Sequence, residues 1–155
     1  MTITHFVIIA VCAYLLGSLS FAIIVSKVTL GKDIRDYGSG NAGLTNAYRT
    51  MGAGKTLFVL IGDIAKGAAA ISIGAYLAGP IGKLVAGIFV ILGHMFPVYF
   101  GFRGGKGVLV GAVMLLLFDW RILLQCSQRG GFRLDRSWVR SASRSPHLPF
   151  TAIRF

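Results

Sequence analysis

A segment rich in glycines and hydrogen-bond donors lies between Arg35 and Arg49. Glycine admits backbone conformations that other residues avoid, so successive N–H groups can converge on one anion. Arg49 adds a planar, permanently charged group that suits phosphate, and a helix beginning at Thr45 would add its positive end. The segment therefore predicts a phosphate-binding loop, and the alternative is a flexible polar loop with solvated charges. Its glycines are Gly38, Gly40 and Gly43, and its side-chain donors are Ser39, Asn41, Thr45 and Asn46.

A single lysine is surrounded by glycines in a second segment, Gly104-Gly105-Lys106-Gly107. These glycines suit a backbone wrapped around an oxyanion, with the Lys106 ammonium placed above it. Basic glycine loops also end many membrane helices, so this pattern alone has low specificity. Together, the two segments predict a surface that binds phosphorylated substrates.

Three ionisable residues lie within apolar stretches. Asp63 and Lys66 are three positions apart, so they share one helical face and can form a structural pair or part of a polar site. A charge at the bilayer centre costs at least ~2.5 kcal/mol, so both are predicted near the end that carries the basic loops. His94 has the chemistry of a general base, but a lone histidine in an apolar helix is usually a packing residue. We therefore predict polar support from these three residues.

Two other patterns are excluded as sites. The stretch Gly52-Ala53-Gly54-Lys55-Thr56 resembles the end of a nucleotide-binding loop, but the full pattern needs glycine where Arg49 stands. Cys12 and Cys126 show neither a pairing pattern nor metal-ligand spacing. No metal, nucleotide or other cofactor is predicted.

The composition indicates an integral membrane protein. Of the 155 residues, 55% are hydrophobic and only 14% are charged, and the mean hydropathy is +0.73. A soluble domain needs more surface charge than this. A net charge of +11 would suggest nucleic acid as the partner of a soluble protein. In a membrane protein it indicates basic loops at an anionic leaflet, so the predicted partner is membrane lipid and no nucleic acid.

Apolar runs alternate with these polar segments and predict an all-α, polytopic fold with about four transmembrane helices. A hydrocarbon core of roughly 30 Å needs about 20 helical residues. Small residues near the end of the first run, Gly17, Ser18 and Ser20, are expected at a helix–helix contact. The sequence at 79–83 predicts a turn. The runs cover about 3–25, 56–78, 84–100 and 108–118.

The distribution of lysine and arginine predicts the orientation. The loop at 27–55 carries five of these residues and the loop at 101–107 carries two, whereas the 79–83 link has one and the N-terminal residues have none. Positive loops face the cytoplasm. The N-terminus is therefore expected outside and both glycine-rich loops inside.

Residues 118–155 have a different composition, with seven arginines, no lysine and no amphipathic period. The predicted organisation is therefore a membrane domain over 1–117 followed by an arginine-rich aberrant or disordered tail. A shifted reading frame or a truncation would produce such a tail, and a genuine basic tail is the alternative.

Three ordered stretches resemble one family. DIRDYGSGNAGLTNAYR at 33–49, GDIAKG at 62–67 and GHMFPVYFGFRGGKGV at 93–108 look like the bacterial acyl-phosphate:glycerol-3-phosphate acyltransferases, the PlsY type. The resemblance implies a multi-pass enzyme of the bacterial inner membrane. Such an enzyme moves a fatty acyl group from acyl phosphate to the 1-hydroxyl of sn-glycerol 3-phosphate, giving lysophosphatidate and phosphate without a cofactor.

The resemblance also implies residue roles. Ser39 and Arg49 match residues required for activity, with Ser39 as a hydrogen-bond donor, and Lys106 is expected to act with them. The glycines Gly104, Gly105 and Gly107 match a glycerol-phosphate-binding loop, and Asn41 and Thr45 match neighbouring phosphate contacts. The family continues with a third motif containing His, Asn and Glu. After about residue 117 this sequence has no such motif, so the acyltransferase domain is expected to be incomplete, and both an active and an inactive chain remain open.

Two functions from other classes remain open on the sequence. Glycine-rich helices with Asp63 and Lys66 would also fit a small transporter or channel component for a phosphorylated anion. A non-catalytic scaffold whose arginine-rich tail binds anionic lipid is the other alternative.

Overall fold

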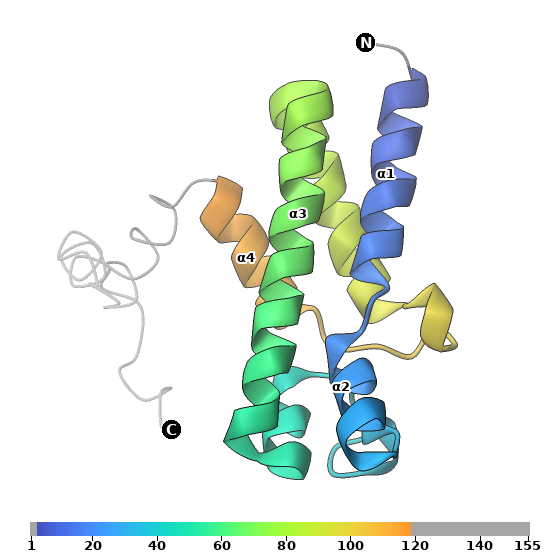
Figure 1. Ribbon diagram of the computed structural model, residues 1–155. Coiled ribbons are helices and arrows are strands. Elements are labelled where there is room, and N and C mark those ends of the chain that lie inside the picture. The colour runs from blue at the N-terminus through green and yellow to red at the C-terminus, as the bar shows by residue number, and fades with distance from the viewer. Residues whose placement is uncertain (1–2, 119–155) are drawn as a thin grey trace, which may run out of the picture. The chain divides into compact units, whose positions relative to one another are not determined.

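The computed structural model describes residues 3–118, and within them every regular element is a helix (Figure 1). The predicted all-α class is confirmed for this part of the chain. The predicted tail lies outside the described residues, apart from Phe118. The elements are α1 (Ile3–Gly17), α2 (Phe21–Leu30), η1 (Ile34–Asp36), α3 (Leu44–Met95), η2 (Val98–Phe100) and α4 (Val108–Phe118).

The first apolar run is divided at residues 18–20, although the sequence predicted one helix over 3–25. The division lies where α1 meets α3 with almost no space between the backbones. A Cβ atom on Gly93 would stand 2.9 Å from the Ser18 nitrogen and 3.0 Å from the Gly17 Cα. Gly17 and Ser18, two of the three small residues predicted at a helix–helix contact, are therefore at one, because only small residues permit such an approach.

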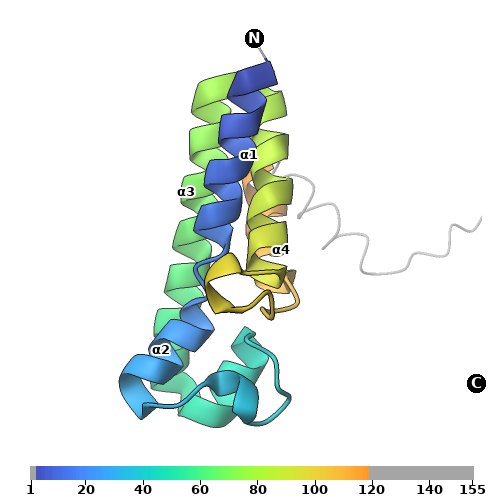
Figure 2. The same ribbon diagram turned by 90° about the vertical axis from the view of Figure 1, so that its right-hand side faces the viewer.

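Helix α3 is a helical hairpin, with a first limb over 53–77 and a second limb over 80–95. The backbone leaves the helical conformation at Gly52, and again at Ala78 and Gly79, where Gly79 has φ 58°. Pro80 then begins the second limb, a position where its missing N–H is no loss. Figures 1 and 2 show both limbs alongside α1. The sequence was right that a turn is present, but the turn lies at 78–79, and residues 80–83 of the predicted link at 79–83 are helical.

Two stretches are long and apolar enough to cross a membrane, Ile3–Leu30 with 28 residues and Leu44–Phe100 with 57. They carry many exposed large apolar side chains, among them Val7, Phe58, Ile61 and Tyr76. Helix α4 has 11 described residues, fewer than the roughly 20 needed to span. The predicted fourth span therefore stays a prediction.

Helix α4 packs against both limbs of the hairpin through their glycines. A Cβ atom on Gly67 would lie 3.3 Å from the Val113 side chain, and one on Gly87 would lie 2.8 Å from Met114. Val110 and Val113 are consequently buried. This packing fixes the start of α4 beside the glycine-rich segment that precedes it.

Candidate functional site

The first glycine-rich loop, residues 31–43, is folded around the side chain of Asn46. The Asn46 Nδ2 group donates to the carbonyl oxygens of Ile34 at 3.1 Å, Tyr37 at 3.0 Å and Asn41 at 3.0 Å. Its Oδ1 accepts the Ser39 N–H at 2.9 Å. Buried polar groups need such partners, and Asn46 is 2% exposed. Its amide is therefore engaged by the loop, which differs from the phosphate contact that the sequence predicted for it.

Two glycines give this loop its shape. Gly38 has φ 60° and Gly40 has φ 71°, values in the left-handed region that favour glycine. A Cβ atom on Gly38 would also collide with the amide oxygen of Asn46. The loop thus needs glycine at 38 both for its backbone conformation and for its approach to Asn46.

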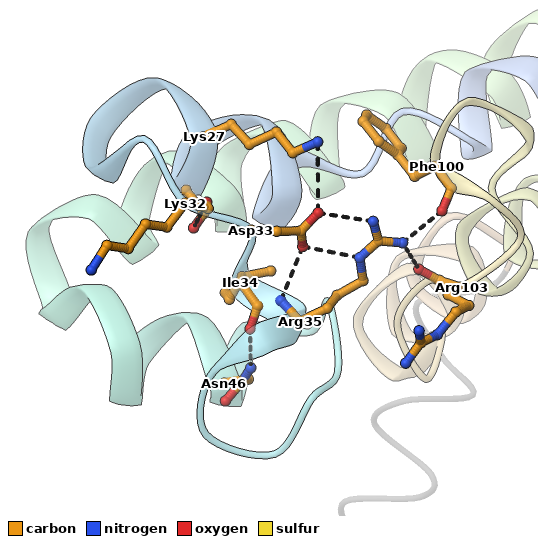
Figure 3. A network of polar contacts seen from close by, with 9 residues as sticks. Lys27, Lys32, Asp33, Ile34, Arg35, Asn46, Phe100 and Arg103 are labelled. Atoms are coloured by element: carbon orange, nitrogen blue, oxygen red, sulfur yellow. Dashed lines mark hydrogen bonds and ion pairs between the residues drawn. The ribbon is translucent and has the colours of Figure 1, made fainter.

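Arg35 joins the first loop to the second glycine-rich segment (Figure 3). Its Nε and Nη2 donate to the Asp33 carboxylate at 2.9 and 2.8 Å. Its Nη1 donates to the carbonyl oxygens of Phe100 at 2.6 Å and Arg103 at 3.1 Å. Lys27 Nζ lies 3.6 Å from the same carboxylate. Hydrogen bonds from Arg35 lower the pKa of Asp33 to about 2, so Asp33 is ionised at neutral pH. The contacts of Arg35 with Asp33, Phe100 and Arg103 are called the Arg35 clamp below.

The second segment packs directly on the first loop. The N–H groups of Gly104 and Gly105 donate to the carbonyl oxygens of Met95 at 3.1 Å and His94 at 3.2 Å, at the end of α3. A Cβ atom on Gly105 would stand 2.8 Å from the Ala42 carbonyl oxygen. These two glycines therefore serve close packing, and their N–H groups are already engaged.

A cavity of about 460 Å³ lies between the two loops. Leu44 begins α3, so the helix start expected near Thr45 is present at the cavity wall. Gly104, Gly105 and Lys66 are not among the lining residues. The predicted site residues that line the cavity are Ser39, Asn41, Thr45, Asn46, Arg49, Asp63, His94, Lys106 and Gly107.

Part of the cavity lining is apolar, which the sequence did not predict; this part is called the apolar wall below. It consists of Leu44 at the start of α3 and of Val108, Leu109 and Ala112 at the start of α4. The apolar run that starts at Val108 is the sequence feature from which this apolar lining could have been predicted. The two basic side chains in the cavity, Arg49 and Lys106, have no ion-pair or hydrogen-bond partner among residues 3–118. The cavity thus offers two available cations beside an apolar wall.

Asp63 and His94, which line the cavity, form one buried polar cluster with Lys66, which does not line it. Lys66 Nζ lies 2.8 Å from Asp63 Oδ1 and 3.0 Å from His94 Nδ1. It also donates to the Leu19 carbonyl oxygen at 2.6 Å, which the division between α1 and α2 leaves available. The predicted pairing of Asp63 with Lys66 is confirmed. Within the described residues no three His, Cys, Asp or Glu side chains are grouped as metal ligands.

Comparisons with known proteins agree on one family. The family model described as glycerol-3-phosphate acyltransferase matches residues 7–132. A glycerol-3-phosphate acyltransferase of Pseudomonas fluorescens is 51% identical over 113 residues, which are 72% of this chain and 59% of that protein. The chain spans about three fifths of the length of the curated relatives it matches.

Two solved structures have a similar fold. Both are crystal structures of PlsY (YgiH), described as an integral membrane glycerol 3-phosphate acyltransferase. The glycerol 3-phosphate form aligns with a TM-score of 0.72 and 34% identity, covering 79% of this chain and 62% of that one. The lysophosphatidic acid form aligns with a TM-score of 0.68 and 31% identity, covering 79% and 61%.

Proposed function

Because this chain belongs to the glycerol-3-phosphate acyltransferase family, we propose that its cavity is the site of acyl transfer to glycerol 3-phosphate. The acyl donor is acyl phosphate, and the products are lysophosphatidate and inorganic phosphate, as in the first acylation of phospholipid synthesis. The family membership argues against the transporter interpretation. The reaction uses no cofactor.

The observation that carries this proposal is the make-up of the cavity. Both substrates bear phosphate, and one also bears a long acyl chain. Arg49 and Lys106 supply two cations without partners within residues 3–118, and the apolar wall lies beside them. A volume of about 460 Å³ falls in the range of small-molecule sites, ~300–1,000 Å³. An amphiphilic phosphate ester suits this combination.

The residues divide into those that contact substrate and those that hold the loops. Arg49 and Lys106 neutralise phosphate charge, and the Ser39 hydroxyl donates a hydrogen bond. The Asn41 and Thr45 side chains and the backbone at Gly107 complete the phosphate contacts. The positioning residues are Asn46, Gly104 and Gly105.

The chemistry needs little more than placement. The glycerol 1-hydroxyl attacks the acyl carbonyl carbon, a new ester bond forms, and the bond to phosphate breaks. Phosphate leaves with the electron pair, and the hydroxyl proton is released. Acyl phosphate has a good leaving group, so orientation and neutralisation of the developing charge account for most of the acceleration.

We place the enzyme in the bacterial inner membrane, with about four spans, the N-terminus outside and both loops in the cytoplasm. The lysine and arginine distribution supports this orientation, and so does the shared cavity, since one cavity requires both loops on one side. The membrane domain is proposed over 1–117, with 118–155 as a tail outside it.

The test is transfer from acyl phosphate to labelled glycerol 3-phosphate by purified protein in detergent. Two chains are compared: the 155-residue chain, and a version whose residues from 118 on are replaced by the C-terminal part of the Pseudomonas fluorescens relative. Turnover by the second is expected, and Ser39→Ala or Arg49→Ala abolishes it while the protein still inserts. Absence of lysophosphatidate from both chains would contradict the proposal.

A further inference from the structure

The ammonium group of Lys66 has three close polar neighbours. A protonated lysine carries three N–H donors and no acceptor. Nζ donates to the Leu19 carbonyl oxygen at 2.6 Å, lies 3.0 Å from His94 Nδ1 and forms an ion pair with Asp63 Oδ1 at 2.8 Å. The Asp63 contact is an ion pair without hydrogen-bond geometry. The Asp63 carboxylate supplies the counter-charge that a buried ammonium requires. Lys66 therefore donates to His94 and does not accept from it.

This contact determines which nitrogen of His94 carries the proton. A nitrogen that accepts a hydrogen bond has no proton of its own, so a neutral ring must carry its proton on Nε2. Asp63 Oδ1 is 3.8 Å from Nδ1, too far to compete as an acceptor. A doubly protonated ring would direct an N–H at the lysine ammonium. The cluster thus selects the neutral Nε2–H form.

The Nε2 atom has no hydrogen-bond partner among residues 3–118, although the His94 residue is only 3% exposed. It faces Gly105, where a Cβ atom would collide with Nε2 and stand 3.1 Å from Cε1. His94 also lines the cavity that contains Arg49 and Lys106. Nε2 is not among the fully buried atoms without a partner, so its N–H is available to an acceptor in the cavity.

We propose that His94 donates its Nε2–H to the phosphate of a substrate held beside Arg49 and Lys106. Asp63 and Lys66 are then positioning residues that set the tautomer of His94. This inference rests on the proposed function and adds a third donor to its phosphate site. It also explains the glycine at 105, since any side chain there would displace the imidazole.

The tautomer is measured first, by ¹⁵N NMR of the histidine-labelled chain in detergent, with the His94 signals assigned through His94→Gln. We expect a neutral ring with its proton on Nε2. Lys66→Met should produce a mixture of tautomers, whereas the matched control Lys55→Met, on the same helix, should not. A proton on Nδ1 in the unsubstituted chain would overturn the proposal.

The phosphate contact is measured by the same NMR experiment on the version that carries the C-terminal part of the Pseudomonas fluorescens relative. Glycerol 3-phosphate should shift the Nε2 resonance and glycerol should not. Binding without any shift would overturn the contact and leave the proposed function standing. If glycerol 3-phosphate does not bind at all, the contact and the proposed function both fail. The tautomer measurement still shows whether Lys66 determines which ring nitrogen of His94 carries the proton.

Kinetics of the active version distinguish a donor from a packing residue. His94→Leu should raise the KM for glycerol 3-phosphate about tenfold to a hundredfold, the effect of losing a hydrogen bond to a charged group, with kcat less affected. His94→Gln retains an N–H donor and should recover most of this loss. Equal behaviour of the two variants would contradict a donor role.

Discussion

Asn46 and Arg49 lie three positions apart near the start of α3, yet they have opposite relations to the cavity. The amide of Asn46 is engaged by three carbonyl oxygens and one N–H of the first loop. The guanidinium of Arg49 has no partner among residues 3–118. One residue therefore maintains the loop and the other is available to a ligand.

This difference predicts separate effects of two substitutions. Asn46→Ala leaves buried loop groups without partners and should cost about 1–3 kcal/mol of stability, together with activity. Arg49→Ala should remove activity and leave stability unchanged. Thermal unfolding in detergent, measured beside acyl transfer, checks both. An Asn46→Ala protein with an unchanged Tm would show that the loop does not depend on this amide.

At the scale of elements, the two glycine-rich loops are held together by the clamp at Arg35 and by the approach of Gly105 to Ala42. The Arg35 contacts with Phe100 and Arg103 cross 65 and 68 residues of sequence. Neither loop would hold its place against the other from local conformation alone.

The clamp predicts a response to acid. The pKa of Asp33 in the folded protein is about 2, below the ordinary aspartate value of 3.8. The stability that the ionised Asp33 adds to the folded protein is therefore fully present above about pH 4 and is lost as pH falls towards 2. Asp33→Asn should be less stable at neutral pH and should lose less stability over that interval. Asp36→Asn, at an exposed neighbour, is the control. Unchanged acid sensitivity in Asp33→Asn would exclude the clamp as its source.

The loop contact predicts a strong effect of a single methyl group. Gly105→Ala would place Cβ against His94 and the Ala42 carbonyl, so the loops must separate and glycerol 3-phosphate binding should fall at least tenfold. Gly54→Ala has open space around it and should leave binding unchanged. Equal binding by the two variants, measured by titration, would contradict the close contact.

At the scale of the whole molecule, the described region has its N-terminus at one end and the first loop at the other (Figure 1). The turn at Ala78 and Gly79 separates the two limbs of α3, so two helical limbs lie between the polar loops along the chain. The proposed orientation, with an outside N-terminus and cytoplasmic loops, requires both limbs to cross the membrane.

The orientation is testable by cysteine labelling in whole cells, with Cys12 and Cys126 replaced by serine. Ile81→Cys, exposed beside the turn, should react with a membrane-impermeant reagent from the periplasm. Lys32→Cys, exposed in the first loop, should react only after the inner membrane is opened. Reversed labelling would place the loops outside.

The sequence by itself determined the helical membrane character, the turn near Pro80 and the two segments that line the cavity. These depend on hydropathy, on glycine and proline, and on charge, which are properties of short stretches of chain. The tertiary structure alone decided how the polar groups are used. Whether Asn46 faces a ligand or a loop depends on how the loop folds around it, with contacts 5 to 12 residues away in sequence. The carbonyl that Lys66 reaches, that of Leu19, is 47 residues away. The division at 18–20 was likewise not predicted from the apolar run; it lies where Gly17 and Ser18 approach Gly93.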